Sequence, residues 1–348
     1  MNTSIIGWDI GGAHLKAAWL DIAAQSLQVI QVACPLWQGI AKLDQAFVEV
    51  ISQLPAGNPI HAVTMTGELV DCFDSRQQGV EAIIASLLRQ FPKEKCWVYA
   101  GSCGFLTPDA VSEQAVMQIA SANWLASVSW ATSKQPHALF VDTGSTTSDI
   151  LLIQEHRLHN LGYTDYERLI SGELVYTGVV RTAVMAVAQS AIFNGHAMGL
   201  MTEHFATMAD VYRLTGDLHE AHDQSPTADG AEKTPLASAR RLSRMTGYEF
   251  HADDWSLWLD FAEHLKQRQK ALLQQACLRQ MARSASPSEL VLIGAGVGRF
   301  LLRELAVELR MPYRDYTDLL PGLGTGTLLD AADCAPAVAV ANLAQRLL

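Results

Sequence analysis

The chain has 348 residues, 49% of them hydrophobic and 18% charged, so it is long enough for two globular domains and too apolar to be disordered throughout. Its net charge of -11 argues against nucleic-acid and anionic-membrane partners, but it is compatible with a small phosphorylated substrate in a locally positive site. No charged leader precedes an apolar segment and the six cysteines form no CxxC pair. We therefore expect a cytoplasmic protein with reduced thiols and no structural zinc.

The first third of the chain predicts one α/β unit. Three β-like runs with short connections favour an antiparallel meander. Apolar residues at helical spacing follow, and a buried strand comes after the breaker "PAGNP". The expected elements are strands at 4–10, 14–22 and 26–36, a helix at 39–53, a strand at 60–69, a helix at 76–90, a strand at 96–102 and helices up to about 133.

The same pattern starts again at "HALFVDTGSTTSDILLIQEHRLHNLG" (137–162). When it is laid over the N-terminus, Asp142 falls on Asp9 (142 − 9 = 133) and Gly144 falls on Gly11 (144 − 11 = 133). In each copy, the aspartate and the glycine lie at a turn between two apolar runs, at the start of an α/β unit. Self-similarity of this kind indicates an internal duplication.

The second half is expected to be mostly helical between about 165 and 285. A polar Gly/Pro/Asp-rich surface loop, 219–235, interrupts it. The uncharged stretches 114–133 and 182–202 contain Gln, Asn, Ser and His, so we interpret both as buried helices rather than membrane spans. A strand, a Gly turn and a helix follow at 289–309. The expected domains are 1–134 and 135–324, with a helical insert at about 185–285 and a C-terminal helix, 325–348, that packs back on the first domain.

Asp9 and Asp142 each lie at the end of an apolar run and are followed by a Gly turn. Backbone N–H groups in such turns point at phosphate oxygens, and glycine permits close approach. Because a carboxylate does not bind phosphate directly, we expect Mg²⁺ and its waters between these aspartates and a phosphate. The competing interpretation is two ordinary β-turns that favour Asp. The residues predicted to bind phosphate are Gly11, Gly12, Ala13, Lys16, Gly144, Ser145, Thr146 and Thr147.

Other candidates carry weaker signals. Lys16 either reaches a phosphate or extends to solvent, and the hydroxyls at 145–147 either bind the anion or form the turn. Gly294 and Gly296, in "IGAGVGRF", lie between a strand and a helix, where an anion can bind the helix N-terminus. Arg240 and Arg244 are four residues apart on one helix face, where they form either a diphosphate clamp or a solvated basic surface.

Taken in order, these motifs resemble the actin-like ATPase, Hsp70 and sugar-kinase superfamily. This implies duplicated actin-like ATPase (ribonuclease H-like) α/β domains, each opening with a three-stranded meander. The strings "TMTGELVDCF", "GELVYTGVVRT" and "ADVYRLTG" are similar, more narrowly, to hydantoinase/oxoprolinase-related proteins linked to tetrahydromethanopterin C1 transfer. The matching motifs extend from Ile6 to Phe300, nearly the whole chain.

This narrower resemblance implies a transferase of methanofuran-type cofactor biosynthesis. It would condense an aminomethylfuran diphosphate with the phenol of a γ-glutamyl-tyramine or tyrosine-like acceptor and release diphosphate. Asp9, Asp142 and Arg181 would stabilise the leaving group. Glu68 and Glu173, from the two "GEL" strings, are candidates for the base.

Two other functions stay open at this point. One is an ATP-dependent kinase or ATPase, and the other is a non-catalytic nucleotide-binding module that regulates a partner. The kinases of the superfamily usually place hydroxyl residues in the first loop, where this chain has Gly12-Ala13-His14, so ATP is an uncertain cofactor. The sequence does not indicate an oligomeric state.

Overall fold

The computed structural model describes residues 4–320 and 329–348. Its contacts divide the chain into two compact units. The first contains the described residues up to Pro136, together with Glu155–Leu158 and Asp315–Leu348, and the second contains His137–Gln154 and His159–Arg314. The final Gly-rich stretch, 321–328, lies outside the described residues, as does the start of the helix expected at 325–348.

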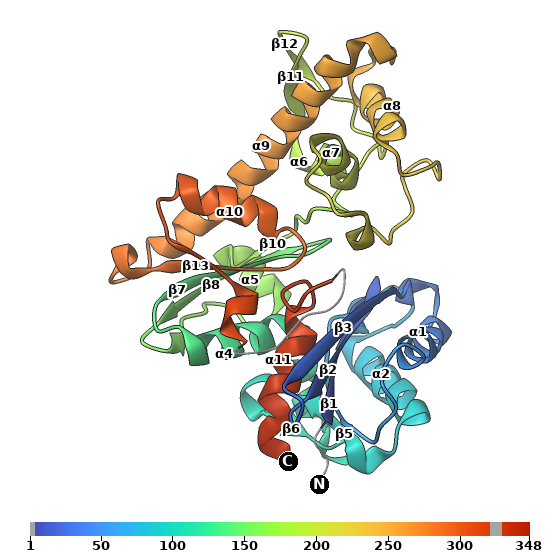
Figure 1. The fold of residues 1–348 in the computed structure, drawn as a ribbon, viewed down its shortest axis with the longest axis vertical. Helices are drawn as coiled ribbons and strands as arrows, with labels where there is room; N and C mark the ends of the chain where they lie inside the picture. Colours follow the sequence, from blue (N-terminus) through green and yellow to red (C-terminus); the bar gives the residue numbers. More distant parts are fainter. Residues whose placement is uncertain (1–3, 321–328) are drawn as a thin grey trace. The chain divides into compact units, whose positions relative to one another are not determined.

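A six-stranded sheet forms the centre of the first unit, in the order β3-β2-β1-β4-β5-β6 (Figure 1). The antiparallel pairs β1–β2 and β2–β3 make up the expected opening meander, while β1, β4 and β5 run parallel. The strands are β1 (Ser4–Ile10), β2 (His14–Asp21), β3 (Ser26–Ala33), β4 (Ile60–Met65), β5 (Cys96–Tyr99) and β6 (Phe105–Leu106).

Helices cover both faces of this sheet. Ile6, Trp8 and Ile10 point to one face, where they pack with apolar residues of α1, α2 and α3. On the other face α11 packs against β1, β2, β4 and α4. The helices of this unit are α1 (Ala41–Ile51), α2 (Arg76–Gln90), α3 (Glu113–Ile119), α4 (Asn123–Lys134) and α11 (Ala335–Leu343), and the unit also holds the short strand β9 (Arg157–Leu158).

Close backbone packing joins α11 to the sheet. A Cβ placed on Gly7 would lie 1.9 Å from the carbonyl oxygen of Ala337 and 2.9 Å from the Cβ of Ala341. Glycine is therefore the residue that lets β1 approach this helix. The alanine-rich C-terminal helix belongs to the core of the first unit, although more than 300 residues separate it from β1.

A neutral histidine is buried on the opposite face of the same strands. The indole Nε1 of Trp8 donates to Nδ1 of His61 at 3.1 Å, and the imidazole stacks on Phe91 with ring centroids 3.8 Å apart. Burial, and then the positive charge of Lys95, lowers the pKa of His61 to about 3. The ring therefore stays uncharged in the folded protein at neutral pH.

We expect this histidine to make the protein acid-sensitive. Between pH 3 and its unfolded pKa of about 6.5, His61 binds a proton in the unfolded chain but not in the folded one, so stability falls as the pH is lowered. His61→Gln retains an acceptor for Trp8 but does not titrate. Between pH 6.5 and 5 the wild-type free energy of unfolding should fall by about 2 kcal/mol more than that of the variant. If urea titrations showed the same change in the free energy of unfolding between pH 6.5 and 5 for both proteins, they would contradict this assignment.

The second unit repeats the central arrangement. In its sheet, of order β10-β8-β7-β13-β14, β7 pairs antiparallel with β8 and parallel with β13. The strands are β7 (Ala138–Thr143), β8 (Ser148–Gln154), β10 (Leu174–Val175), β13 (Val291–Ala295) and β14 (Tyr313–Asp315). The helices are α5 (Asp165–Ser171), α6 (Val184–Val187), α7 (Met208–Thr215), α8 (Pro235–Thr246), α9 (Trp255–Met281) and α10 (Arg299–Glu308).

The helix expected at 182–202 is wrong for most of that stretch. Only α6 is helical, and a hairpin follows, formed by β11 (Ser190–Phe193) and β12 (His196–Gly199). Asn194 and Gly195 have φ values of 49° and 74° at its tip. Asn-Gly is the preferred pair for a tight hairpin turn, because both positions need positive φ. The absence of charge in this stretch obscured that local signal.

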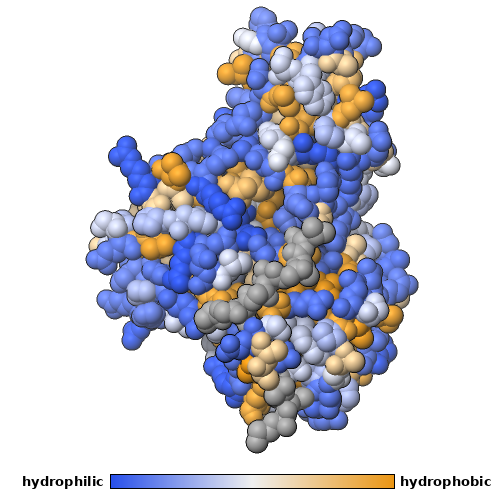
Figure 2. Space-filling view, viewed as in Figure 1, coloured by the Kyte–Doolittle hydropathy of each residue, from blue (hydrophilic) through white to orange (hydrophobic). Residues whose placement is uncertain are grey.

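The surface and the thiols agree with the composition. Figure 2 shows hydrophilic side chains over most of the visible face, with apolar ones scattered among them. Within the described ranges, no helix combines the length and the hydropathy that a membrane span requires. All six cysteines are free; burial raises the pKa of Cys34, Cys96, Cys277 and Cys334 to about 12, while Cys72 and Cys103 are exposed.

Candidate functional site

The same Gly turn occurs once in each unit. Asp9 is the residue before the last of β1, and Asp142 has the same place in β7. In the first turn the amide of Gly11 donates to the carbonyl of His14 at 3.0 Å, and in the second Gly144 donates to Thr147 at 2.9 Å. The aspartate, the glycine and the closing hydrogen bond therefore recur together. This geometry supports the duplication expected from the sequence.

The segment that follows β3 supports the first turn. The amides of Leu36 and Cys34 donate to the carbonyls of Gly12 and Ala13 at 3.0 and 2.8 Å. In a trans peptide the N–H points opposite to the C=O, so the amides of Ala13 and His14 point away from this support. Such an orientation suits a turn whose N–H groups receive an anion. His14 itself is buried, with 7% of its surface exposed.

A row of polar side chains crosses the first sheet at Asp9. Asp9 pairs in register with Lys16 on β2 and with Thr64 on β4. The carboxylate of Asp9 is buried and accepts from Nδ2 of Asn123 at 3.4 Å. Lys16 Nζ donates to the carbonyl of Asp333 at 2.9 Å, just before α11. Lys16 therefore lies in the fold beside Asp9 rather than extending to solvent.

Glu68 lies in the same unit, in the 3₁₀ turn Gly67–Leu69 that follows β4. Its side chain is fully buried and Oε1 accepts from the hydroxyl of Ser121 at 2.8 Å. This turn contacts the first Gly turn, since the amide of Thr66 donates to the carbonyl of Ile10 at 2.9 Å. The fold therefore brings the "TGEL" string to the end of β1, beside the turn that follows Asp9.

The segment after β10 supports the second turn. Val179 donates to the carbonyl of Gly144 at 3.1 Å, and Arg181 donates its backbone amide to Ser145 at 2.8 Å. A Cβ on Gly178 would lie 2.4 Å from the amide nitrogen of Thr146, so glycine is needed for this approach. The guanidinium of Arg181 donates to the hydroxyl of Thr146 at 3.5 Å. Arg181 is thus the cation that the structure places at this turn.

The turn after β13 packs directly on Asp142. Gly296 has φ 81°, and a Cβ there would lie 2.4 Å from Oδ1 of Asp142. The amide of Gly298 donates to the carbonyl of Thr143 at 2.8 Å. Gly294 lies inside β13, where a Cβ would collide with the ring of Tyr313, so the structure gives this glycine a packing role.

Our sequence analysis missed two polar side chains near the second turn. On α9, Gln269 Nε2 donates to the hydroxyl of Thr177 at 2.7 Å and to the carbonyl of Gly178 at 2.9 Å. Arg299 Nε donates to the carbonyl of Gly296 at 3.0 Å. Nothing in the helical pattern of α9 distinguishes Gln269. A buried arginine in the first turn of α10, where the helix dipole disfavours a cation, was a usable signal.

The contacts of Glu173 anchor a loop. Its buried carboxylate accepts from the backbone amides of Leu161 and Gly162 at 2.7 and 2.9 Å. Ser171 Oγ and Arg283 also donate to it, at 2.8 and 3.1 Å. Because these donors already occupy the oxygens of the carboxylate, a structural role for Glu173 is favoured over that of a base.

Arg240 and Arg244 lie on the exposed face of α8. Arg240 covers the ring of Phe250 at 5.6 Å, and Arg244 pairs with Asp229 at 3.3 Å. The neighbouring Arg241 is fully buried and pairs with Asp210 at 2.7 Å. This arrangement favours the solvated-face interpretation for Arg240 and Arg244.

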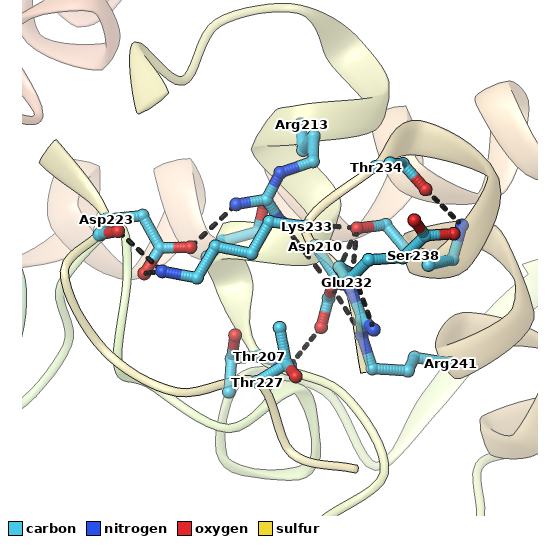
Figure 3. Close-up of polar contacts among 12 residues, drawn as sticks. Thr207, Asp210, Arg213, Asp223, Thr227, Glu232, Lys233, Thr234, Ser238 and Arg241 are labelled. Carbon is cyan, nitrogen blue, oxygen red and sulfur yellow. Dashed lines mark hydrogen bonds and ion pairs between the residues drawn. The ribbon is translucent and has the colours of Figure 1, made fainter. Parts of the chain in front are cut away.

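Ion pairs also fix the loop 219–235. Asp223 pairs with Arg213 at 2.6 Å and with Lys233 at 3.3 Å, and Figure 3 shows these side chains grouped with Asp210, Ser238 and Arg241. Any movement of this loop would have to break these contacts.

Magnesium binding by Asp9 and Asp142 stays a prediction. Within the part of the chain that the structure describes, no three His, Cys, Asp or Glu side chains gather as a metal-binding group. Mg²⁺ is usually held by one or two carboxylates together with water and substrate phosphate. Asp9 and Asp142 each offer one carboxylate within their own unit, and Gly296 places no side chain against Asp142.

Comparisons with known proteins agree with these motifs. A family model described as hydantoinase/oxoprolinase matches residues 60–321. The (4-{4-[2-(gamma-L-glutamylamino)ethyl]phenoxymethyl}furan-2-yl)methanamine synthase of Methanocaldococcus jannaschii is 29% identical over 301 residues, 85% of this chain and 87% of that protein. The synthase of the same name from Methanococcus vannielii is 29% identical over 109 residues, 31% of this chain and 49% of that protein.

A solved structure also matches the chain. Acetone carboxylase in its nucleotide-free form aligns with a TM-score of 0.51 and 11% identity, over 98% of this chain and 70% of that chain. At this identity the likeness concerns the fold alone. Together with the two sheets, it confirms the predicted fold class, α/β of the actin-like ATPase type.

Proposed function

The chain belongs to the hydantoinase/oxoprolinase family, and from this membership and its relatives we propose that it is a transferase of methanofuran-type cofactor biosynthesis. The observation that carries the proposal is the 29% identity to the Methanocaldococcus jannaschii synthase over most of both chains. The product for which that synthase is named contains an aryl ether between a phenol oxygen and the methylene carbon on position 4 of the furan, whose position 2 carries the aminomethyl group. We infer that this chain forms the same kind of bond.

The proposed reaction joins an aminomethylfuran diphosphate to the phenol of a γ-glutamyl-tyramine or tyrosine-like acceptor. The phenol oxygen forms a bond to the methylene carbon on position 4 of the furan, the bond from that carbon to the diphosphate oxygen breaks, and diphosphate leaves with the electron pair. The phenolic proton passes to a base. Because the furan ring stabilises positive charge on the adjacent carbon, stabilising the leaving group supplies much of the catalysis.

The residues at the two turns suit a diphosphate leaving group. Because the amides of Gly11 and Gly144 close their own turns, those at 12–14 and 145–147 would receive its oxygens, and Arg181 would balance charge as the carbon–oxygen bond breaks. Asp9 and Asp142 would hold Mg²⁺ through water, and that ion supplies positive charge to the leaving group when bound. Glu68 is the better placed of the two predicted bases, since it lies beside the first turn whereas Glu173 anchors a loop.

One assay separates this reaction from nucleotide chemistry. Purified protein with Mg²⁺ receives an aminomethylfuran diphosphate together with γ-glutamyl-tyramine, and in a separate mixture it receives ATP. We expect diphosphate and the coupled ether from the first mixture and no phosphate from the second. Phosphate release that requires ATP, with no ether formed, would instead support a kinase or ATPase. Nucleotide binding without turnover in either mixture would support a regulatory module.

A further inference from the structure

Ser121 has an unusual backbone conformation for a buried serine. It lies in the short connection between α3 and α4, with φ 51° and only 4% of its surface exposed. Six non-glycine residues of the described chain have positive φ, and the other five, Gln25, Glu155, His156, Asn194 and Arg310, are exposed. A left-handed conformation strains residues other than glycine, and strain of this kind persists where the surrounding structure requires it.

The chain uses glycine at nine other described positions with positive φ, so the serine at 121 stands out. The distinguishing group is its hydroxyl, which donates to Oε1 of Glu68 at 2.8 Å inside the protein. Glycine would relieve the backbone strain but would remove this donor. The hydrogen bond from the hydroxyl to Glu68 therefore offsets the strain in the backbone.

Glu68 is held from both sides. Its backbone packs on α2, where a Cβ on Gly79 would lie 2.2 Å from the carbonyl oxygen of Glu68. Its carboxylate receives the Ser121 hydroxyl from the α3–α4 connection. Directly after this connection comes Asn123, the first residue of α4, whose side-chain amide donates to Asp9 at 3.4 Å. Ser121 and Asn123, two residues apart, thus contact carboxylates at the ends of the neighbouring parallel strands β4 and β1.

We propose that Ser121 is a positioning residue for Glu68: its hydroxyl fixes the orientation of the buried carboxylate. This inference rests on the proposed function, in which Glu68 accepts the phenolic proton. A hydrogen bond to the charged form of a carboxylate lowers its pKa. Removing the hydroxyl should therefore raise the pKa of Glu68 and misorient the base, without removing it.

The test uses Ser121→Ala and Ser121→Gly, which both lack the hydroxyl, with Glu68→Gln and Gln25→Gly for comparison. Gln25 has φ 49° on an exposed turn, so its replacement relieves similar strain away from any candidate residue. The substrates are the aminomethylfuran diphosphate and γ-glutamyl-tyramine. We expect Ser121→Ala and Ser121→Gly each to lower kcat about tenfold with KM little changed, and to move the acid limb of the kcat–pH profile upward by about one unit.

The remaining variants separate the inference from the proposed function. Glu68→Gln should lose nearly all turnover, and Gln25→Gly should have wild-type kcat and an unshifted profile. An inactive Glu68→Gln with a wild-type profile in both Ser121 variants would overturn the positioning role and leave the proposed function standing. A fully active Glu68→Gln would remove both the base assignment and the positioning role.

Thermal unfolding gives a measurement that needs no substrate. Ser121→Gly should melt at a higher temperature than Ser121→Ala, because glycine has no strain at this φ. The difference in melting temperature between wild type and Ser121→Ala should shrink in acid, where the carboxylate becomes protonated, since a hydrogen bond donated to the ionised carboxylate is then lost in both proteins. A difference that does not change with pH would contradict the proposal even if no turnover were found.

Discussion

Replacing Gly7 with alanine should lower the free energy of unfolding of the first unit by about 3 kcal/mol. The new Cβ would lie 1.9 Å from the carbonyl oxygen of Ala337, so β1 and α11 must move apart. That movement loosens packing along an interface of small side chains, where close contact contributes most of the dispersion energy. Urea titration followed by tryptophan fluorescence measures the loss, because Trp8 and Trp124 are both buried in this unit.

Gly199→Ala is the matched control for this substitution. Gly199 also lies in a strand, β12, but a Cβ there meets no atom within 4 Å. Its replacement should be neutral or stabilise the protein by about 0.5 kcal/mol, since alanine loses less backbone entropy on folding than glycine. Equal stability of the two variants would show that α11 does not pack on β1 as described.

Asp142→Asn should reduce turnover in the coupling assay by about 10²–10³-fold while the fold is retained. The amide has nearly the same size as the carboxylate but carries no charge to hold a cation at the second turn. Circular dichroism and the melting temperature should stay close to the wild-type values. If Asp142→Asn unfolded the protein, the metal-binding role of this residue would lose its support.

Asp149→Asn provides a nearby contrast. Asp149 pairs in register with Asp142 across β7 and β8, but its carboxylate binds Arg168 at 2.7 Å. Breaking that largely buried ion pair should cost about 3 kcal/mol of stability, because the arginine loses its partner. Turnover per folded molecule should change little. We thus expect Asp142 to be needed for turnover and its neighbour Asp149 to be needed for stability.

Local sequence patterns determined a large part of this fold. Three β-like runs with short connections predicted the meander β1–β2–β3, and the repetition of this pattern predicted β7 and β8. The match of Asp142 to Asp9 in the sequence corresponds to a match in structure, because equivalent hydrogen bonds close the two turns. These features depend on residues close together in the chain, which is why periodicity and Gly positions reveal them. The hairpin at Asn194-Gly195 was equally local, but we gave more weight to the lack of charge.

Tertiary structure alone decided which polar residues meet. Glu68 and Glu173 have similar strings around them, yet only Glu68 lies beside a Gly turn, while Glu173 anchors the amides of a distant loop. Ser121 and Gln269 reach their partners across 53 and more than 90 residues, and no local pattern encodes such contacts. Binding of one ligand by both Gly turns remains a prediction for the assays above. The sequence by itself determined the turns and their aspartates, because backbone geometry is a local property; the fold determined their neighbours, because side-chain contacts depend on packing between distant segments.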